Sequence, residues 1–128
     1  MESRTMTRKE IELTGNFIES LKTENVDLFW SCLSKCSKEK IQSGVIDYSE
    51  DDVMYLLKKV KENYGDSLEK MGVGNKIRFT NEEKTKGFSL NQNNVQTTIH
   101  FFPATEINAT QLPLELDDDG FKINLFNS

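Results

Sequence analysis

The segment 112–123 reads LPLELDDDGFKI, and its pattern decides the fold expected for the second half of the chain. Every second residue from Leu112 to Leu116 is leucine, which is the alternation typical of a strand with one buried face. Asp119-Gly120 then gives a strong signal for a tight turn between antiparallel strands, and apolar residues alternate again over 121–125. The segment therefore predicts a β-hairpin with one apolar face.

Further alternating stretches lie upstream of this hairpin. Residues 76–80 and 95–103 alternate apolar with polar side chains, and Phe88 and Leu90 alternate in the same way between them, with Phe88 on the apolar side. Polar turn residues separate the three stretches. We therefore expect the strands within 76–126 to pair consecutively in one antiparallel sheet that is covered on one side.

The first half of the chain carries helical patterns with recognisable ends. Residues 7–10 have the spacing of a capping box, in which a threonine hydroxyl and a glutamate three residues later satisfy each other's backbone N–H groups. Asn25 is a good N-cap for a second helix that ends near Cys36. A third helix is expected over 50–64, because an acidic run begins it and Gly65 stops it.

Helices followed by strands predict an α+β fold, with the N-terminal helices packed on one face of an antiparallel sheet. The length of 128 residues is that of one domain, and no linker or repeat divides the sequence. We therefore expect a single domain over 1–128, with residues 1–6 as a loose N-terminal tail.

The chain carries a formal charge of -5 at pH 7. An acidic surface repels phosphate backbones, so we expect no nucleic acid partner. The longest apolar run, Val53–Leu57, is far shorter than the ~20 residues of a membrane-spanning helix. The N-terminus has no apolar stretch of signal-peptide type. We therefore expect a cytoplasmic protein that does not associate with membranes.

The two cysteines, Cys32 and Cys36, lie four residues apart on one face of the second expected helix. A disulfide at this spacing would be strained. A zinc site would need a second pair of ligands, and the only histidine is distant in sequence. We expect two buried free thiols, no metal and no cofactor.

Two segments resemble the NTF2-like (cystatin-like) superfamily, in which three helices form a cone wrapped by a curved antiparallel sheet. Residues 16–34 are similar to the opening helix pair of that family. Residues 112–123 are similar to its closing hairpin, where an acidic turn and a glycine precede an aromatic residue and a lysine. The resemblance implies a pocket between helices and sheet and a homodimer through the outer sheet face. It implies no single function, because many functions share this fold.

Polar candidates for function lie in the expected sheet. An acidic cluster is found at Glu115, Asp117, Asp118 and Asp119. A solvated turn explains the cluster most simply, and an acidic patch for a basic protein partner is the functional interpretation. Strand parity places His100, the only histidine, on the outer sheet face, which favours an exposed or interface position over a catalytic one.

Aromatic residues would line the pocket that the resemblance implies, and the candidates are Trp30, Tyr48, Tyr55, Phe79 and Phe101. Core packing is the alternative for each of them. The sequence has no nucleophile motif and no phosphate-binding loop. The leading hypothesis is therefore a non-catalytic binding domain for a protein partner, with an inhibitor or immunity protein as one version. The alternatives are a small cyclase, isomerase or dehydratase, and a carrier of a small hydrophobic ligand.

Overall fold

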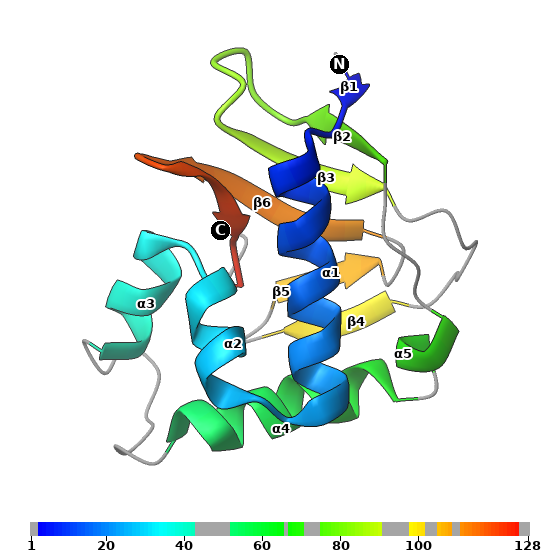
Figure 1. Ribbon diagram of the computed structural model, residues 1–128, viewed down its shortest axis with the longest axis vertical. Helices are drawn as coiled ribbons and strands as arrows, with labels where there is room; N and C mark the ends of the chain where they lie inside the picture. Colours follow the sequence, from blue (N-terminus) through cyan, green and yellow to red (C-terminus); the bar gives the residue numbers. More distant parts are fainter. Residues whose placement is uncertain are drawn as a thin grey trace.

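The computed structural model describes residues 3–42, 52–65, 67–70, 75–90, 98–101, 105–108 and 111–125. The helices are α1 (Arg8–Thr23), α2 (Val26–Cys32), α3 (Lys35–Gln42), α4 (Asp52–Tyr64) and α5 (Ser67–Lys70). The strands are β1 (Ser3–Thr5), β2 (Lys76–Phe79), β3 (Lys86–Leu90), β4 (Thr98–Phe101), β5 (Thr105–Asn108), β6 (Gln111–Asp117) and β7 (Gly120–Ile123). Helix α1 crosses in front of the sheet (Figure 1), and the α+β class is confirmed.

The start of α1 has the expected capping box. The Thr7 hydroxyl accepts a hydrogen bond from the Glu10 N–H at 3.2 Å, and the Glu10 carboxylate accepts one from the Thr7 N–H at 3.0 Å. The same carboxylate accepts two hydrogen bonds from the Arg4 guanidinium, each at 2.7 Å. Arg4 belongs to β1, which pairs antiparallel with β2. The expectation of a loose tail is therefore wrong for residues 3–5.

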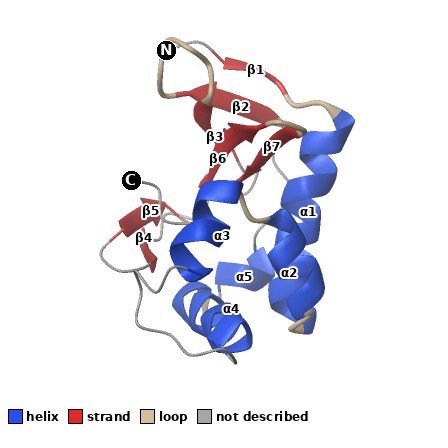
Figure 2. Cartoon of the chain, turned by 90° about the vertical axis from the view of Figure 1, so that its left-hand side faces the viewer, coloured by secondary structure: helices blue, strands red, loops and turns tan. Residues whose placement is uncertain are grey.

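The five-stranded sheet has the order β1-β2-β3-β6-β7, with every pair antiparallel. The β6–β7 hairpin is confirmed, but consecutive pairing of all strands is wrong. Strands β4 and β5 pair with each other in a separate two-stranded sheet (Figure 2). Alternation specifies which face of a strand is buried and leaves its neighbour open, so the sequence pattern did not reveal that β3 pairs with β6.

Strand β6 has a proline in its middle, Pro113, and the position of the proline nitrogen in the sheet explains why this is tolerated. Pro113 is the register partner of Phe88 in β3. On its other side, the Pro113 carbonyl accepts a hydrogen bond from the Asn124 N–H at 2.8 Å. Asn124 follows the last residue of β7. The missing N–H of Pro113 would therefore point toward Asn124, just past the end of the edge strand β7. The hydrogen-bond ladder between β6 and β7 has ended there, so little is lost.

The inner and outer sides of β3 are the reverse of those expected. Gly87 is buried on the helix-facing side, and Phe88 lies half-buried on the outer side. The rings of Phe79 and Phe121, whose centroids lie 6.2 Å apart, occupy the inner face beside Gly87. A Cβ atom on Gly87 would lie 2.6 Å from the Arg78 carbonyl oxygen. The inner face accepts only glycine at this point, so Phe88 takes the outer side.

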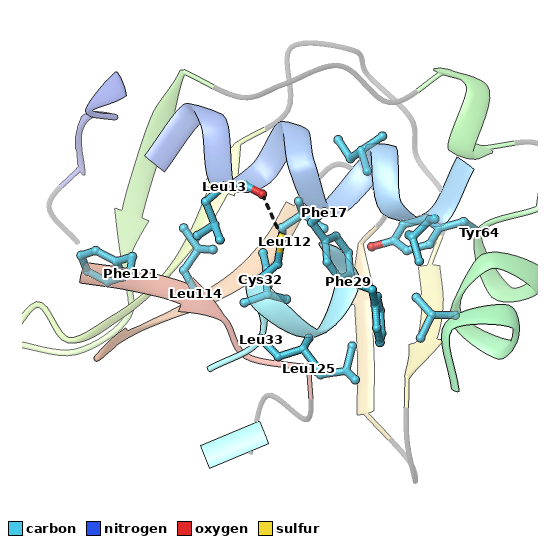
Figure 3. Close-up of a cluster of buried hydrophobic side chains, with 14 of the residues drawn as sticks. Leu13, Phe17, Phe29, Cys32, Leu33, Tyr64, Leu112, Leu114, Phe121 and Leu125 are labelled. Carbon is cyan, nitrogen blue, oxygen red and sulfur yellow. Dashed lines mark hydrogen bonds between the residues drawn. The ribbon is translucent and has the colours of Figure 1, made fainter. Parts of the chain in front are cut away.

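The hydrophobic core lies between the helices and the inner face of the sheet. The rings of Phe17 in α1 and Phe29 in α2 stack with centroids 5.8 Å apart (Figure 3). Tyr64, the last residue of α4, is fully buried at the other side of the cluster, and this burial raises the pKa of its hydroxyl well above the usual value. Core residues come from both halves of the chain, including Leu21, Leu56, Leu57, Ile77, Leu114, Ile123 and Leu125.

The second expected helix divides at Leu33. The Ser34 N–H donates to the Ile123 carbonyl oxygen at 2.8 Å, so Leu33 forms a parallel bridge to β7 instead of continuing α2. The cysteines therefore lie in different helices, with Cys32 buried and Cys36 exposed. The expectation of a buried thiol is confirmed for Cys32 and wrong for Cys36.

Candidate interaction surface

The turn between β6 and β7 carries three consecutive carboxylates, Asp117, Asp118 and Asp119, which we call the acidic tip. Gly120 follows with a φ of 122°, a backbone conformation that favours glycine. In Figure 1 this end of the hairpin extends to the left beyond α1. The backbone of the tip therefore lies away from the core.

Contacts from two helices fix the shape of the acidic tip. The Asp117 carboxylate accepts a hydrogen bond from the Lys35 N–H at the start of α3, at 2.8 Å. The Lys9 ammonium in α1 donates to the Asp119 carbonyl oxygen. The Lys122 ammonium lies 3.8 Å from the Asp119 carboxylate. Asp117 is therefore engaged in holding α3, whereas Asp118 and Asp119 face solvent.

A hollow of about 390 Å³ lies beside the acidic tip, lined by Lys35, Leu116 and the tip residues. The Leu116 side chain is 46% exposed, whereas Leu112 and Leu114 are buried. The apolar alternation of β6 therefore continues past the end of the core. Protein interfaces commonly have an apolar centre and a polar rim. An exposed leucine beside carboxylates has both of these components.

The other polar candidates lie elsewhere. Glu115 is on the outer sheet face, in register with Lys86 of β3 and Lys122 of β7. Its Oε1 atom is buried and has no hydrogen-bond partner within the described part of the chain. His100 lies in β4, opposite Glu106 of β5, and therefore belongs to the two-stranded sheet. Neither residue adjoins the acidic tip in the β6–β7 turn.

The aromatic candidates belong to separate elements. Phe79 is buried under the Arg4 guanidinium, whose carbon lies 5.6 Å from the ring centroid. Trp30 is half-buried in α2 beneath the Lys38 ammonium, and Tyr55 is 48% exposed in α4. Phe101 lies in β4, with only its backbone described, and Tyr48 lies outside the described residues.

Two further hollows are formed by described residues, and neither these nor the hollow beside the acidic tip is lined by Trp30, Tyr55 or Phe79. The larger, of about 560 Å³, lies between α4, α5 and the end of α1, where the Glu24 carboxylate pairs with Lys61 at 3.4 Å. The smaller, of about 220 Å³, lies over Cys32, with a rim that includes Lys9, Glu12 and Lys122.

The buried thiol of Cys32 has little reactivity. Its burial raises the pKa, and the hydrogen bond from Ser31 and the charges of Lys122 and Lys38 offset this only in part. Over the described ranges, no group of three or more histidine, cysteine or acidic residues is placed to hold a metal ion. No described helix is both long and apolar enough to cross a membrane.

Sequence reasoning overlooked a set of cations on the outer sheet face. Lys76 and Arg78 in β2 and Lys86 in β3 are exposed. The signal was present, because Lys76 and Arg78 alternate with the buried residues of β2. Comparison with family models, curated proteins and solved structures found no match for the chain. The interpretation of the site therefore rests on the chain's own residues.

Proposed function

We propose that the chain is a non-catalytic protein-interaction domain that presents its acidic tip and Leu116 to a basic partner. The observation that carries the proposal is the exposed leucine beside the solvent-facing carboxylates of Asp118 and Asp119. The carboxylates would attract cationic side chains and speed association, and Leu116 would supply buried apolar area. An inhibitor or immunity protein acting on a basic target is the version that fits this surface best.

The alternatives draw less support from the described residues. A small enzyme or a hydrophobic-ligand carrier needs an apolar cavity that encloses most of its ligand. The three hollows are open and have charged residues on their rims. In the hollow beside α4 and α5, the Glu24 carboxylate is already engaged by Lys58 and Lys61. The NTF2-like resemblance and the homodimer remain predictions, and the proposal uses neither.

A salt titration with a basic probe tests the proposal. We expect a fluorescent oligolysine peptide to bind the protein, with an affinity that falls steeply between low and physiological ionic strength. The double variant Asp118→Asn/Asp119→Asn should weaken binding several-fold at low salt. The matched control is Glu82→Gln/Glu83→Gln, which removes the same charge from another exposed turn and should weaken binding much less. Equal losses in the two variants would refute a specific role for the tip.

The apolar part of the surface has its own test. Leu116→Ser removes an exposed side chain, so the free energy of unfolding should change by less than about 0.5 kcal/mol. Affinity for a peptide that alternates lysine with leucine should fall, while affinity for oligolysine should stay the same. A parallel fall for both peptides would contradict an apolar contact at Leu116.

A further inference from the structure

The outer face of β2 and β3 carries a second charged surface, opposite in sign to the acidic tip. Lys76, Arg78 and Lys86 are exposed on this face, and Phe88 lies half-buried among them. We call these four residues the basic sheet face. The alternation of β2 directs Ile77 and Phe79 toward the helices, so Lys76 and Arg78 lie on the opposite side.

The strand register places these residues side by side. Arg78 in β2 is directly opposite Phe88 in β3, and Phe88 is in turn opposite Pro113 in β6. Directly opposed side chains lie about 5 Å apart at their Cβ atoms. A row of cation, aromatic ring and proline therefore runs across three neighbouring strands, with Lys76 and Lys86 in the rows on either side.

The cations of β2 lack the carboxylate partners that several other cations of the described residues have. Several lysines and arginines on the helices and on β7 have carboxylate partners, as in the pairs Arg8–Glu12, Lys59–Glu62, Lys61–Glu24 and Lys122–Asp119. Within the described residues, Lys76 and Arg78 have no such partner. Glu115, the carboxylate in register with Lys86, lies at the far side of Phe88 from Lys76. The β2 side of the face therefore keeps its positive charge.

We propose that the basic sheet face binds an acidic segment of a partner protein. Carboxylates of the segment would pair with Arg78 and Lys76, with the Arg78 guanidinium able to accept a carboxylate in a two-point contact. An apolar side chain of the segment would pack on the half-buried Phe88 ring. The surface is separate from the acidic tip and does not rest on the function proposed for it.

Charge decides among the possible occupants. The net charge of -5 repels a phosphate backbone, and three local cations offset only part of this repulsion. Nucleic acid is therefore disfavoured. A second copy in twofold symmetry would bring two basic sheet faces together, and like charges in contact oppose such an interface. A short acidic segment carries fewer negative charges than a phosphate backbone, so its repulsion by the net charge is smaller, and it brings no second cationic face.

Fluorescence anisotropy with a labelled peptide that alternates glutamate with leucine tests the proposal. We expect the wild-type protein to bind this peptide at low ionic strength. Lys76→Glu/Arg78→Glu should weaken binding by about tenfold, the loss expected from two charge-assisted contacts. Arg8→Glu/Lys22→Glu changes the net charge equally at exposed positions of α1 and should weaken it less than about twofold.

The contrary outcomes are distinct. Equal weakening by the two double variants would show a net-charge effect and overturn the proposal. Tighter binding of a single-stranded oligothymidylate would assign the face to nucleic acid instead. Self-association of the wild type that disappears in Lys76→Glu/Arg78→Glu would assign it to a second copy. Failure of oligolysine binding at the acidic tip would refute the proposed function and leave the acidic-peptide result unaffected.

Discussion

The Glu10 carboxylate links β1 to the start of α1, because it accepts hydrogen bonds from the Arg4 guanidinium and from the Thr7 N–H. Glu10 is only 7% exposed. Its burial raises the pKa, but the hydrogen bonds from Arg4 and Thr7 and the charge of Arg4 outweigh this effect. The pKa of Glu10 therefore lies below its ordinary value. A carboxyl group with a lowered pKa stabilises the fold above its unfolded pKa and loses that contribution as the pH falls through the folded pKa.

The pH dependence of Glu10→Gln follows from this sign. We expect the substitution to lower the free energy of unfolding by about 1–2 kcal/mol at neutral pH, since a charge-assisted pair is lost while the amide still caps Thr7. The difference from the wild type should stay constant above about pH 5 and shrink as the pH falls below the unfolded value of about 4.3. Urea titrations across this range measure it.

The matched control for Glu10 is Glu12→Gln. The Glu12 carboxylate is 61% exposed and lies 3.4 Å from Arg8 on the same helix, so its removal should cost less than about 0.5 kcal/mol at any pH. A difference between wild type and Glu10→Gln that persists unchanged to pH 3 would contradict the lowered pKa.

Gly87 has a steric role that its neighbours do not share. An added methyl group would lie 2.6 Å from the Arg78 carbonyl oxygen, which is a backbone atom of the paired strand. We expect Gly87→Ala to lower the free energy of unfolding by about 1–3 kcal/mol, because β2 and β3 must move apart. Chemical denaturation measures the loss. An alanine variant as stable as the wild type would mean that the strands yield without cost.

The predictions made for single residues were correct where the structure depends on neighbours in sequence, and wrong where it depends on other strands. The capping box at Thr7 and Glu10 depends on neighbours in sequence, so the sequence alone predicted it. The outward position of Phe88 depends on the close approach of β2 to Gly87, where an added Cβ atom would meet the Arg78 backbone. Alternation counted from the larger side chain therefore assigned β3 to the wrong parity.

At the scale of elements, a buried pair of serines ties α3 to the end of the sheet. The Ser37 hydroxyl accepts a hydrogen bond from the Leu125 N–H at 2.9 Å and lies 2.9 Å from the Ser34 hydroxyl. The Ser34 hydroxyl also accepts a hydrogen bond from the Ser37 N–H in the first turn of α3. Both serines are fully buried. Polar groups in such a position stabilise the fold only while their partners are present.

Replacement of Ser37 should therefore loosen this junction. We expect Ser37→Ala to lower the free energy of unfolding by about 1–3 kcal/mol, because the buried Leu125 N–H loses its acceptor. The matched control is Ser31→Ala in α2, whose exposed hydroxyl donates to the Leu28 carbonyl oxygen of the same helix, and its cost should be below about 0.5 kcal/mol. Amide hydrogen exchange at Leu125 provides a local check, and unchanged protection there would contradict the assignment.

The order of the strands shows where element-scale inference from sequence stopped. The β6–β7 hairpin was predicted because Asp119-Gly120 determines the turn locally. The pairing of β3 with β6 joins Phe88 to Pro113 across the β4–β5 hairpin, and no local pattern specifies a contact at that separation. The break at Leu33 was missed for a related reason, since its partner Ile123 lies at the other end of the chain.

At the scale of the whole molecule, the two cysteines should differ in reactivity, because one is exposed and the other becomes accessible only when the protein unfolds. Cys36 is exposed, whereas Cys32 is 2% exposed and its pKa is raised by burial. We expect an aromatic disulfide reagent to titrate one thiol quickly in the native protein and the second only on unfolding. The variant Cys36→Ser should react only when denaturant is added. Fast reaction of both thiols without denaturant would contradict the packing of α2 against α1.

The distribution of charge over the molecule was only partly foreseeable. The sequence located the acidic tip, because its three aspartates are consecutive. It did not show that Glu115 lies on the outer sheet face, away from the three aspartates. It also did not reveal the cations of β2, because residues on one face of a strand alternate with buried residues and are not adjacent in sequence. The net charge of -5 describes neither surface. The two proposed partners therefore have opposite charge.

The crossing of Ser34 beside β7 has a consequence for growth of the sheet. The hydrogen bond from Ser34 to Ile123 occupies the end of β7 at one margin of the five-stranded sheet, and β1 forms the other margin. That margin offers the backbone groups of three residues, which is too short a template for robust cross-chain pairing. A fibril seed or an exchanged neighbour would first have to displace β1 and break the Arg4–Glu10 pair.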